Sequence, residues 1–294
     1  MLFGVYIFMQ TKKVCNTKRE DKQKMLKLNG KTVGVNHFPD NTILIKQECR
    51  EDAENFGSYT IDWRYENSEE IVALIYLTKH IRAHGGTRIN LLMPYIPNAR
   101  QDRVKNAEDV FTLKYFAWVI NELRFDSVRV TDPHSTVSEA LFDNLTICSP
   151  KQYIDEVLGR IEPNGDPIMF YPDEGAMKRY SGMIDKKYAF GIKKRDWETG
   201  QINGLDVSGR VELIKDSNVL IVDDICSRGG TFYHSAKKLK ELGAAKIYLY
   251  VTHCEPTVFE GEVLTSGLIE RVFTTDSIFK SEHEKITVIP IKNK

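Results

Sequence analysis

The sequence is poor in several features, and each absence excludes a class of protein. The 294 residues include only five cysteines and no Cys-X-X-Cys pair, which argues against a disulfide framework or a cysteine-rich zinc site. The 41 basic residues are balanced by 41 acidic ones, so a general nucleic-acid-binding surface is not expected. No apolar run is long enough to span a bilayer. We therefore expect a cytoplasmic protein that binds neither nucleic acid nor membrane.

The apolar stretch from Met1 to Met9 is not expected to be a signal peptide. It has no basic segment before it, and it meets Lys12 and Lys13 too soon for a complete hydrophobic region with a cleavage site. We expect a β-strand there instead.

The most informative segment, VLIVDDICSRGGT, runs from Val219 to Thr231. Its apolar run predicts a strand buried on both faces, which ends in Asp223 and Asp224. The turn that follows consists of Ser227, Arg228, Gly229, Gly230 and Thr231. Glycines allow a tight turn, and the amides that open the next helix can hold a phosphate. Because ionised carboxylates accept hydrogen bonds from vicinal hydroxyls or bind a metal, the segment indicates a site for a phosphorylated ribose.

The arrangement of helical and strand patterns suggests two similar halves. A helical pattern that begins near Asn67 is stopped by Gly85 and Gly86, and a strand pattern follows over 88–93. The same order returns over 237–252, and residues 125–132 resemble residues 269–276. We therefore predict an α/β protein with two similar domains, each a mostly parallel sheet flanked by helices, at residues 1–149 and 150–294.

Five further segments carry residues suited to phosphate, nucleotide or metal binding. They are HFPDNT at 37–42, PYIPNARQDR at 94–103, TDPH at 131–134, PDEGAMKR at 172–179 and KKR at 193–195. With the segment from Val219 to Thr231, they follow the order found in ribose-phosphate pyrophosphokinases, which the chain resembles from Val35 to Phe279. Type I phosphoribosyltransferases share the last segment but lack the Ala-Arg-Gln-Asp element.

The resemblance implies two phosphoribosyltransferase-like domains, with ATP on the N-terminal side, ribose 5-phosphate on the C-terminal side and a possible exchange of the C-terminal segment. The implied reaction transfers the diphosphoryl group of ATP to the C1 hydroxyl of ribose 5-phosphate. Its products, phosphoribosyl pyrophosphate and AMP, would serve nucleotide and NAD synthesis. Protein groups would act mainly by positioning and by neutralising charge on the transferring oxygens.

The resemblance also implies a role for individual residues. ATP would be bound by Phe38, Asp40, Arg100, Gln101 and Asp102. Ribose 5-phosphate would be bound by Asp223, Asp224, Ser227, Arg228, Gly229, Gly230 and Thr231. His134 and Asp173 would hold Mg²⁺, and Lys193, Lys194 and Arg195 would be the catalytic cations of a mobile loop within 181–218. A homo-oligomer is implied too, because the Phe38 loop of such enzymes comes from a neighbouring subunit.

Several residues depart from the family pattern and leave alternatives open. Asn41 and Thr42 replace a usual Gly-Glu pair, and Ser227 and Arg228 replace a usual Asp-Thr pair. The side chain of Arg228 either folds inward onto the sugar phosphate or turns outward, to solvent or to a nearby acid. For the whole chain, a phosphoribosyltransferase and a non-catalytic regulatory homologue of the synthase are the alternative functions.

Overall fold

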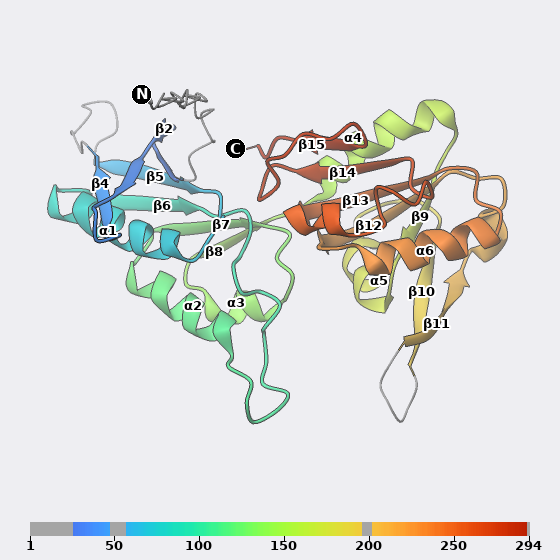
Figure 1. The fold of residues 1–294 in the computed structure, drawn as a ribbon, viewed down its shortest axis with the longest axis horizontal. Coiled ribbons are helices and arrows are strands. Elements are labelled where there is room, and N and C mark those ends of the chain that lie inside the picture. The colour runs from blue at the N-terminus through green and yellow to red at the C-terminus, as the bar shows by residue number, and fades with distance from the viewer. Residues whose placement is uncertain (1–25, 48–56, 196–201, 293–294) are drawn as a thin grey trace, which may run out of the picture.

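The computed structural model describes residues 26–47, 57–195 and 202–292, and within them most strands belong to two sheets that lie side by side (Figure 1). Both sheets are mostly parallel and flanked by helices, which confirms the expected α/β class. The strand expected over Met1 to Met9 falls outside the described residues. None of the helices in the described ranges is long and apolar enough to cross a membrane.

The first sheet has the strand order β2-β1-β5-β6-β7-β8. Its strands are β1 (Leu26–Leu28), β2 (Lys31–Thr32), β5 (Ser58–Trp63), β6 (Arg88–Leu92), β7 (Ser127–Thr131) and β8 (Leu145–Cys148). Strands β5 to β8 are parallel, whereas β1 pairs antiparallel with both β2 and β5. The helices of this half are α1 (Glu69–Ala83), α2 (Thr112–Glu122) and α3 (Val137–Leu141). Buried apolar residues of α1 and α2 form one core with the sheet.

The second sheet has the order β11-β10-β9-β12-β13-β14-β15. Its strands are β9 (Ile168–Tyr171), β10 (Tyr188–Arg195), β11 (Ile202–Gly209), β12 (Val219–Cys226), β13 (Ile247–Cys254), β14 (Arg271–Thr275) and β15 (Ile286–Ile289). All neighbours are parallel except β10 and β11. Since β15 pairs with β14, the C-terminal strand of the described chain stays in its own sheet.

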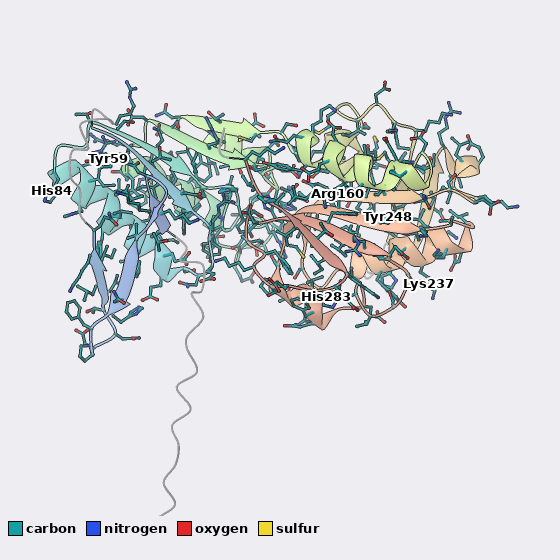
Figure 2. The ribbon with its side chains drawn as sticks, turned by 90° about the horizontal axis from the view of Figure 1, so that it is seen from above. Tyr59, His84, Arg160, Lys237, Tyr248 and His283 are labelled. Carbon is teal, nitrogen blue, oxygen red and sulfur yellow. The ribbon has the colours of Figure 1, made fainter. Side chains whose placement is uncertain are left out.

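Helices cover both faces of the second sheet. They are α4 (Lys151–Ile161), α5 (Glu174–Tyr180) and α6 (Gly230–Glu241), with short 3-10 turns η1 (Glu162–Asn164), η2 (Val211–Leu213) and η3 (Pro256–Glu260). In Figure 2, Arg160 on α4 and Lys237 on α6 lie on opposite sides of this sheet. Alternate residues of β12 accordingly enter two different cores, Ile221 with α6 and Val222 with α4 and α5. Double-sided burial explains the continuous apolar run in the sequence.

Two hairpins extend beyond these layers. The first joins β3 (Gly34–His37) to β4 (Ile43–Lys46), and it projects from the first domain away from the second (Figure 2). The second joins β10 to β11, within the segment over which we expected a mobile loop. Residues 188–195 and 202–209 of that segment are therefore strand, and residues 196–201 lie outside the described structure. Gly191 and the basic residues 193–195 interrupt the apolar pattern of β10. Its hydrophobic periodicity therefore does not predict a strand.

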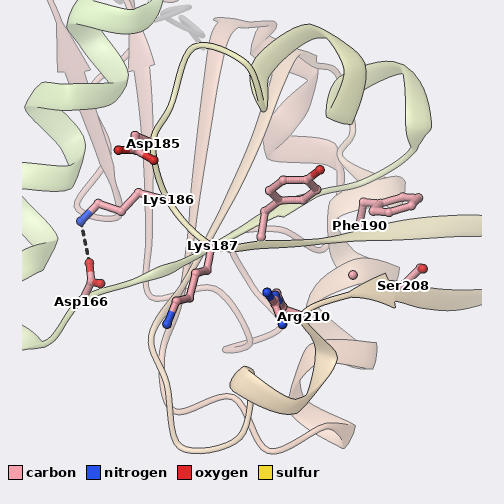
Figure 3. Close-up of a pocket in the computed structure, with 9 residues that line it drawn as sticks. Asp166, Asp185, Lys186, Lys187, Phe190, Ser208 and Arg210 are labelled. Carbon is pink, nitrogen blue, oxygen red and sulfur yellow. Dashed lines mark hydrogen bonds and ion pairs between the residues drawn. The ribbon is translucent and has the colours of Figure 1, made fainter.

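A surface pocket of about 780 Å³ lies at the base of the β10–β11 hairpin, and Figure 3 shows the residues around it. Lys186 pairs there with Asp166 at 2.6 Å, while the aromatic rings of Tyr188 and Phe190 line another part. Acidic and basic groups both line this pocket, and none of the motif residues predicted from sequence does. It is therefore not the candidate active site.

Helix α1 allows a direct test of the first core. Leu74 is fully buried there, whereas Val72 on the same helix is 37% exposed. Leu74→Ala should lower the free energy of unfolding by about 2–5 kcal/mol, because it removes packed methyl groups and leaves a cavity. Val72→Ala should change it by less than about 1 kcal/mol. Urea denaturation measures both, and equal losses would contradict this assignment of the buried face.

Candidate active site

The candidate site lies where the carboxyl ends of strands from both sheets meet. Figure 1 shows β12 and β13 running toward the first domain, and the segment after β7 faces them from that domain. Hydrogen bonds from Thr252 to Asp132 and between His134 and Asp224 join the two sides. Ligands of open parallel sheets bind outside the carboxyl ends of the strands. The fold therefore brings three of the predicted motifs to one place.

Asp224 is the central charge of this site. It is buried at the end of β12, and its Oδ2 atom accepts a hydrogen bond of 2.6 Å from His134 Nδ1. Arg179 Nη1, from α5, lies 3.2 Å from the same oxygen. Burial alone would raise the pKa of Asp224, but the hydrogen bond and charge of His134 and the charge of Arg179 outweigh it and hold that pKa well below its usual value.

The neighbouring carboxyl, Asp223, behaves in the opposite way. Burial first, and then the negative charge of Asp224, raise the pKa of Asp223 well above its usual value. Adjacent carboxyls in a poorly solvated place resist double ionisation. The two carboxyls therefore carry one stable negative charge. A cation placed between them would favour ionisation of the second carboxyl.

Asp132 is buried on the other side of the domain junction. Its Oδ2 accepts hydrogen bonds from Tyr180 Oη at 2.9 Å and from Thr252 Oγ1 at 2.5 Å. Burial and the charge of Asp224 raise the pKa of Asp132 to about 7. Its backbone φ of 46° is uncommon for a residue other than glycine, and such strained positions cluster at functional sites.

His253 fixes the junction from β13. Its Nε2 lies 3.0 Å from the carbonyl oxygen of Thr131, and its Nδ1 lies 2.8 Å from Ser277 Oγ. The first contact requires the proton on Nε2, so Nδ1 accepts from the Ser277 hydroxyl. The imidazole is fully buried, and this burial lowers the pKa of His253 to about 4. The neutral ring thus links the end of β7 to the second domain.

The turn predicted to hold a phosphate follows β12 directly. Gly229 has a φ of 76°, and a Cβ there would lie 2.1 Å from Val263 Cγ2, so only glycine fits. Gly230 and Thr231 open helix α6 and are exposed. Ser227 Oγ lies 3.0 Å from Thr257 Oγ1. The turn therefore presents the amides of a helix N-terminus next to Asp223 and Asp224.

The side chain of Arg228 settles into one of the two orientations considered from the sequence. Its Nη2 atom lies 2.8 Å from Glu260 Oε2, and both side chains are more than half exposed. The guanidinium thus pairs with a nearby acid. An inward contact with a sugar phosphate would require this exposed pair to open.

The residues predicted to bind ATP are divided between two regions. Arg100 forms an ion pair with Glu255 of the second domain. Gln101 accepts a hydrogen bond of 2.8 Å from Thr112. The buried Asp102 accepts from Arg103 at 2.8 Å and from Ser135 at 2.7 Å. The hydrogen bond from Arg103, followed by that from Ser135, lowers the pKa of Asp102 to about 2 despite its burial, so its role within the chain is to hold the segment next to His134.

Phe38 and Asp40 lie at the tip of the β3–β4 hairpin. Phe38 is 48% exposed. Asp40 accepts hydrogen bonds from the backbone and side chain of Thr42, at 3.0 and 2.7 Å, and these bonds lower the pKa of its carboxyl. Because the hairpin projects away from the second domain (Figure 2), one chain does not bring this tip to Asp224.

The remaining residues predicted to hold Mg²⁺ or to act as catalytic cations lie at the start of helix α5 and in strand β10. Asp173 caps helix α5 by accepting a hydrogen bond of 3.0 Å from the Ala176 amide. Lys193, Lys194 and Arg195 belong to β10 by their backbone, and their side chains lie outside the described structure. In the part of the chain that is described, no three His, Cys, Asp or Glu side chains gather as a metal site.

Sequence reasoning missed several polar residues at the junction. They are Asp132, Arg179, Tyr180, Thr252, His253 and Glu255. Asp132 lies in the TDPH motif and Arg179 in the PDEGAMKR motif, but roles were assigned from the sequence only to other residues of these two motifs. Thr252 and His253 end a strand in the second half, and polar residues at that position of a parallel sheet are the signal that would have found them.

The two mostly parallel sheets, with a strand that ends in paired carboxyls next to a glycine-rich, helix-opening turn, define an α/β protein of the open parallel-sheet class. The fold is similar to that of phosphoribosylpyrophosphate synthetase from Mycobacterium smegmatis, with a TM-score of 0.71 over 88% of this chain and 86% of that one, at 19% identity. A search of family models gave no match.

Curated proteins give the closer assignment. The chain is 30% identical to the ribose-phosphate pyrophosphokinase of Thermococcus kodakarensis over 243 residues, which cover 82% of this chain and 81% of that protein. It is 25% identical to the ribose-phosphate pyrophosphokinase of Saccharolobus solfataricus, over 85% and 86% of the two chains. The chain therefore belongs to the ribose-phosphate pyrophosphokinase family of enzymes, which confirms the resemblance inferred from its motifs.

The buried imidazole of His253 predicts a pH dependence of stability. Since its pKa is lowered to about 4 in the folded state, the unfolded chain binds this proton first on acidification. The folded state should thus lose about 2 kcal/mol from this residue between about pH 7 and about pH 5.

His253→Gln keeps an N–H donor for the Thr131 carbonyl but does not titrate. Urea denaturation at both pH values should show a smaller loss on acidification for the variant than for the wild type. Equal losses of unfolding free energy in the variant and the wild type would mean that His253 becomes protonated in the folded state over this pH range.

Proposed function

We propose that this protein transfers the β,γ-diphosphoryl group of ATP to the C1 hydroxyl of ribose 5-phosphate, giving phosphoribosyl pyrophosphate and AMP for nucleotide and NAD synthesis. The observation that carries the proposal is the position of Asp223 and Asp224. They lie between a helix-opening phosphate turn of one domain and His134 of the other. Such a junction can bring a sugar phosphate and a nucleotide together.

Ribose 5-phosphate fits the second domain in one orientation. Its phosphate would accept hydrogen bonds from the amides of Gly229, Gly230 and Thr231, helped by the dipole of α6. The 2- and 3-hydroxyls would then donate to Asp223 and Asp224. This leaves the C1 hydroxyl pointing toward the first domain, where its oxygen bonds to the β-phosphorus of ATP. The bond from that phosphorus to the α-phosphate oxygen breaks, the hydroxyl loses its proton, and AMP leaves.

The described junction residues do not gather as a three-ligand metal site, so a Mg²⁺ ion there would be held largely through its own waters. His134 donates Nδ1–H to the Asp224 carboxylate, and among the described residues its Nε2 has no hydrogen-bond partner. A metal-binding histidine commonly uses its second nitrogen in this way. Asp173 and Asp223 would supply the oxygen donors that Mg²⁺ prefers. When bound, Mg²⁺ would neutralise charge on the phosphates of ATP.

The nucleotide would be held by groups from more than one place. Arg100 offers a planar fork for phosphate oxygens. Lys193, Lys194 and Arg195 would bring positive charge to the transferring group from the β10–β11 hairpin. Phe38 and Asp40 would bind the adenosine of a neighbouring subunit, since their hairpin projects away from the site of their own chain. The proposal thus includes a homo-oligomer with a shared nucleotide site.

Incubation of the protein with ATP, Mg²⁺ and ribose 5-phosphate should produce AMP together with phosphoribosyl pyrophosphate, measured by chromatography. Omission of the sugar phosphate or of the metal should abolish AMP formation. ADP as the nucleotide product would overturn the diphosphoryl transfer. Consumption of phosphoribosyl pyrophosphate with a free base would instead assign a phosphoribosyltransferase. Stimulation of an active synthase, without turnover by this chain alone, would assign a regulatory homologue.

A conservative substitution tests the residue roles in the same assay. Asp223→Asn should lower kcat/KM for ribose 5-phosphate at least about tenfold in the presence of Mg²⁺, because the bound cation favours the ionised form of Asp223 and a hydrogen bond to a charged group is worth about 1.5–3 kcal/mol. Asp155→Asn, on the exposed face of α4, removes a carboxylate whose ion-pair partner among the described residues is the nearby Lys151, and it should leave kcat/KM within about twofold.

A further inference from the structure

Two histidines lie about one helical turn apart at the carboxyl end of α1, on the side of the first domain that faces away from the second (Figure 2). They are His80, which is partly buried, and His84, which is the C-cap residue and is exposed. Residues four positions apart on a helix lie on the same face, and the two ring centroids are 4.2 Å apart. Neither the family motifs nor the proposed reaction gives this pair a role.

Each imidazole uses one nitrogen as a hydrogen-bond donor. His80 Nε2 lies 3.1 Å from the carbonyl oxygen of Gln47, and His84 Nδ1 lies 2.9 Å from the carbonyl oxygen of His80. Because a carbonyl oxygen only accepts, these two nitrogens carry the proton of the neutral rings. The nitrogens that keep a lone pair are therefore His80 Nδ1 and His84 Nε2, and neither has a hydrogen-bond partner within the described ranges.

This arrangement is typical of histidines that bind a metal ion. A metal-binding imidazole commonly donates its other N–H to a backbone carbonyl or a carboxylate, which fixes its tautomer and its orientation. Two imidazoles that share one ion place their ring centroids about 4.5–5 Å apart, because each metal–nitrogen bond is about 2.0–2.1 Å long. The observed separation of 4.2 Å needs only a small side-chain rotation to reach that range. The carboxyl end of a helix also favours positive charge.

We propose that His80 and His84 bind one divalent transition-metal ion, of the class of Ni²⁺, Zn²⁺ or Cu²⁺, with water in the remaining positions. Imidazole nitrogen suits these ions, whereas Mg²⁺ prefers oxygen ligands. The site is separate from the domain junction, and it does not depend on the proposed reaction. With only two protein ligands, it binds an exchangeable ion rather than a permanent one.

A bound ion would act on the structure through the same hydrogen bonds. Coordination at Nδ1 makes the Nε2–H group of His80 a stronger donor to Gln47, which directly follows β4. The ion therefore joins the last turn of α1 and strengthens its contact with the end of the β3–β4 hairpin. An ion that binds the folded protein in this way raises its melting temperature.

The test is a calorimetric titration of the full-length protein, without an affinity tag, with NiCl₂ in the presence of excess Mg²⁺. His84→Gln keeps an N–H donor for the carbonyl of His80 but lacks the free ring nitrogen. Its Ni²⁺ Kd should be at least about tenfold higher than that of the wild type, because even the hydrogen-bond partner of a metal ligand is worth about 10–100-fold in affinity. His80→Gln, which keeps a donor for Gln47, should show the same loss.

His234→Gln is the matched control, because His234 is also exposed on a helix, α6, but has no histidine four residues away. It should keep the wild-type Kd. NiCl₂ should raise the melting temperature of the wild type and of this control, but not that of His80→Gln or His84→Gln. Equal Ni²⁺ Kd values in the wild type and in those two variants would overturn the site. An equal loss of affinity in His234→Gln would also overturn it, since exposed histidines in general would then bind the ion.

Discussion

The ionised carboxylate of Asp224 is the charge on which the interdomain arrangement depends. It is buried at the end of a central strand, where an isolated charge is costly, and it is kept ionised by His134 and Arg179. His134 comes from the first domain and Arg179 from the second, so one carboxylate joins two units that otherwise have separate cores. Removal of either partner would leave the buried charge with a single compensating group, which is more damaging than the absence of all three groups.

A second layer of buried polar groups surrounds this charge and fixes the angle at which the sheets meet. Asp132 takes two hydroxyl donors from the second domain, and His253 returns a hydrogen bond to the carbonyl of Thr131. The pKa of Asp132 is raised to about 7 and that of His253 is lowered to about 4, and burial is the main cause of both shifts. His253 is thus neutral near pH 7 and Asp132 is only partly ionised there, whereas Asp224 stays ionised and carries most of the negative charge of the junction. A site of this kind attracts a cation and, through it, the phosphates of a nucleotide.

The sequence predicted the features that depend on neighbours along the chain. The doubly buried strand before Asp223, the glycine turn and the mostly parallel α/β class all follow from local patterns. The β10–β11 hairpin was missed, because its basic and glycine residues conceal the strand periodicity. The partners of Asp224, and the pairing of Arg100 with Glu255, were also missed. Such contacts join residues more than 40 positions apart, and only the packing of two domains brings them together. The motif order pointed to a common site, but not to the hydrogen bonds that hold it.

The most direct measurement is a crystal structure of the protein with Mg²⁺, ribose 5-phosphate and a non-hydrolysable ATP analogue. We expect the sugar phosphate on the amides of Gly229, Gly230 and Thr231, and its hydroxyls on Asp223 and Asp224. We also expect the β-phosphorus of the analogue next to the C1 hydroxyl, on the side of His134. A nucleotide bound away from the domain junction, or a sugar phosphate bound outside the turn after β12, would contradict this expectation.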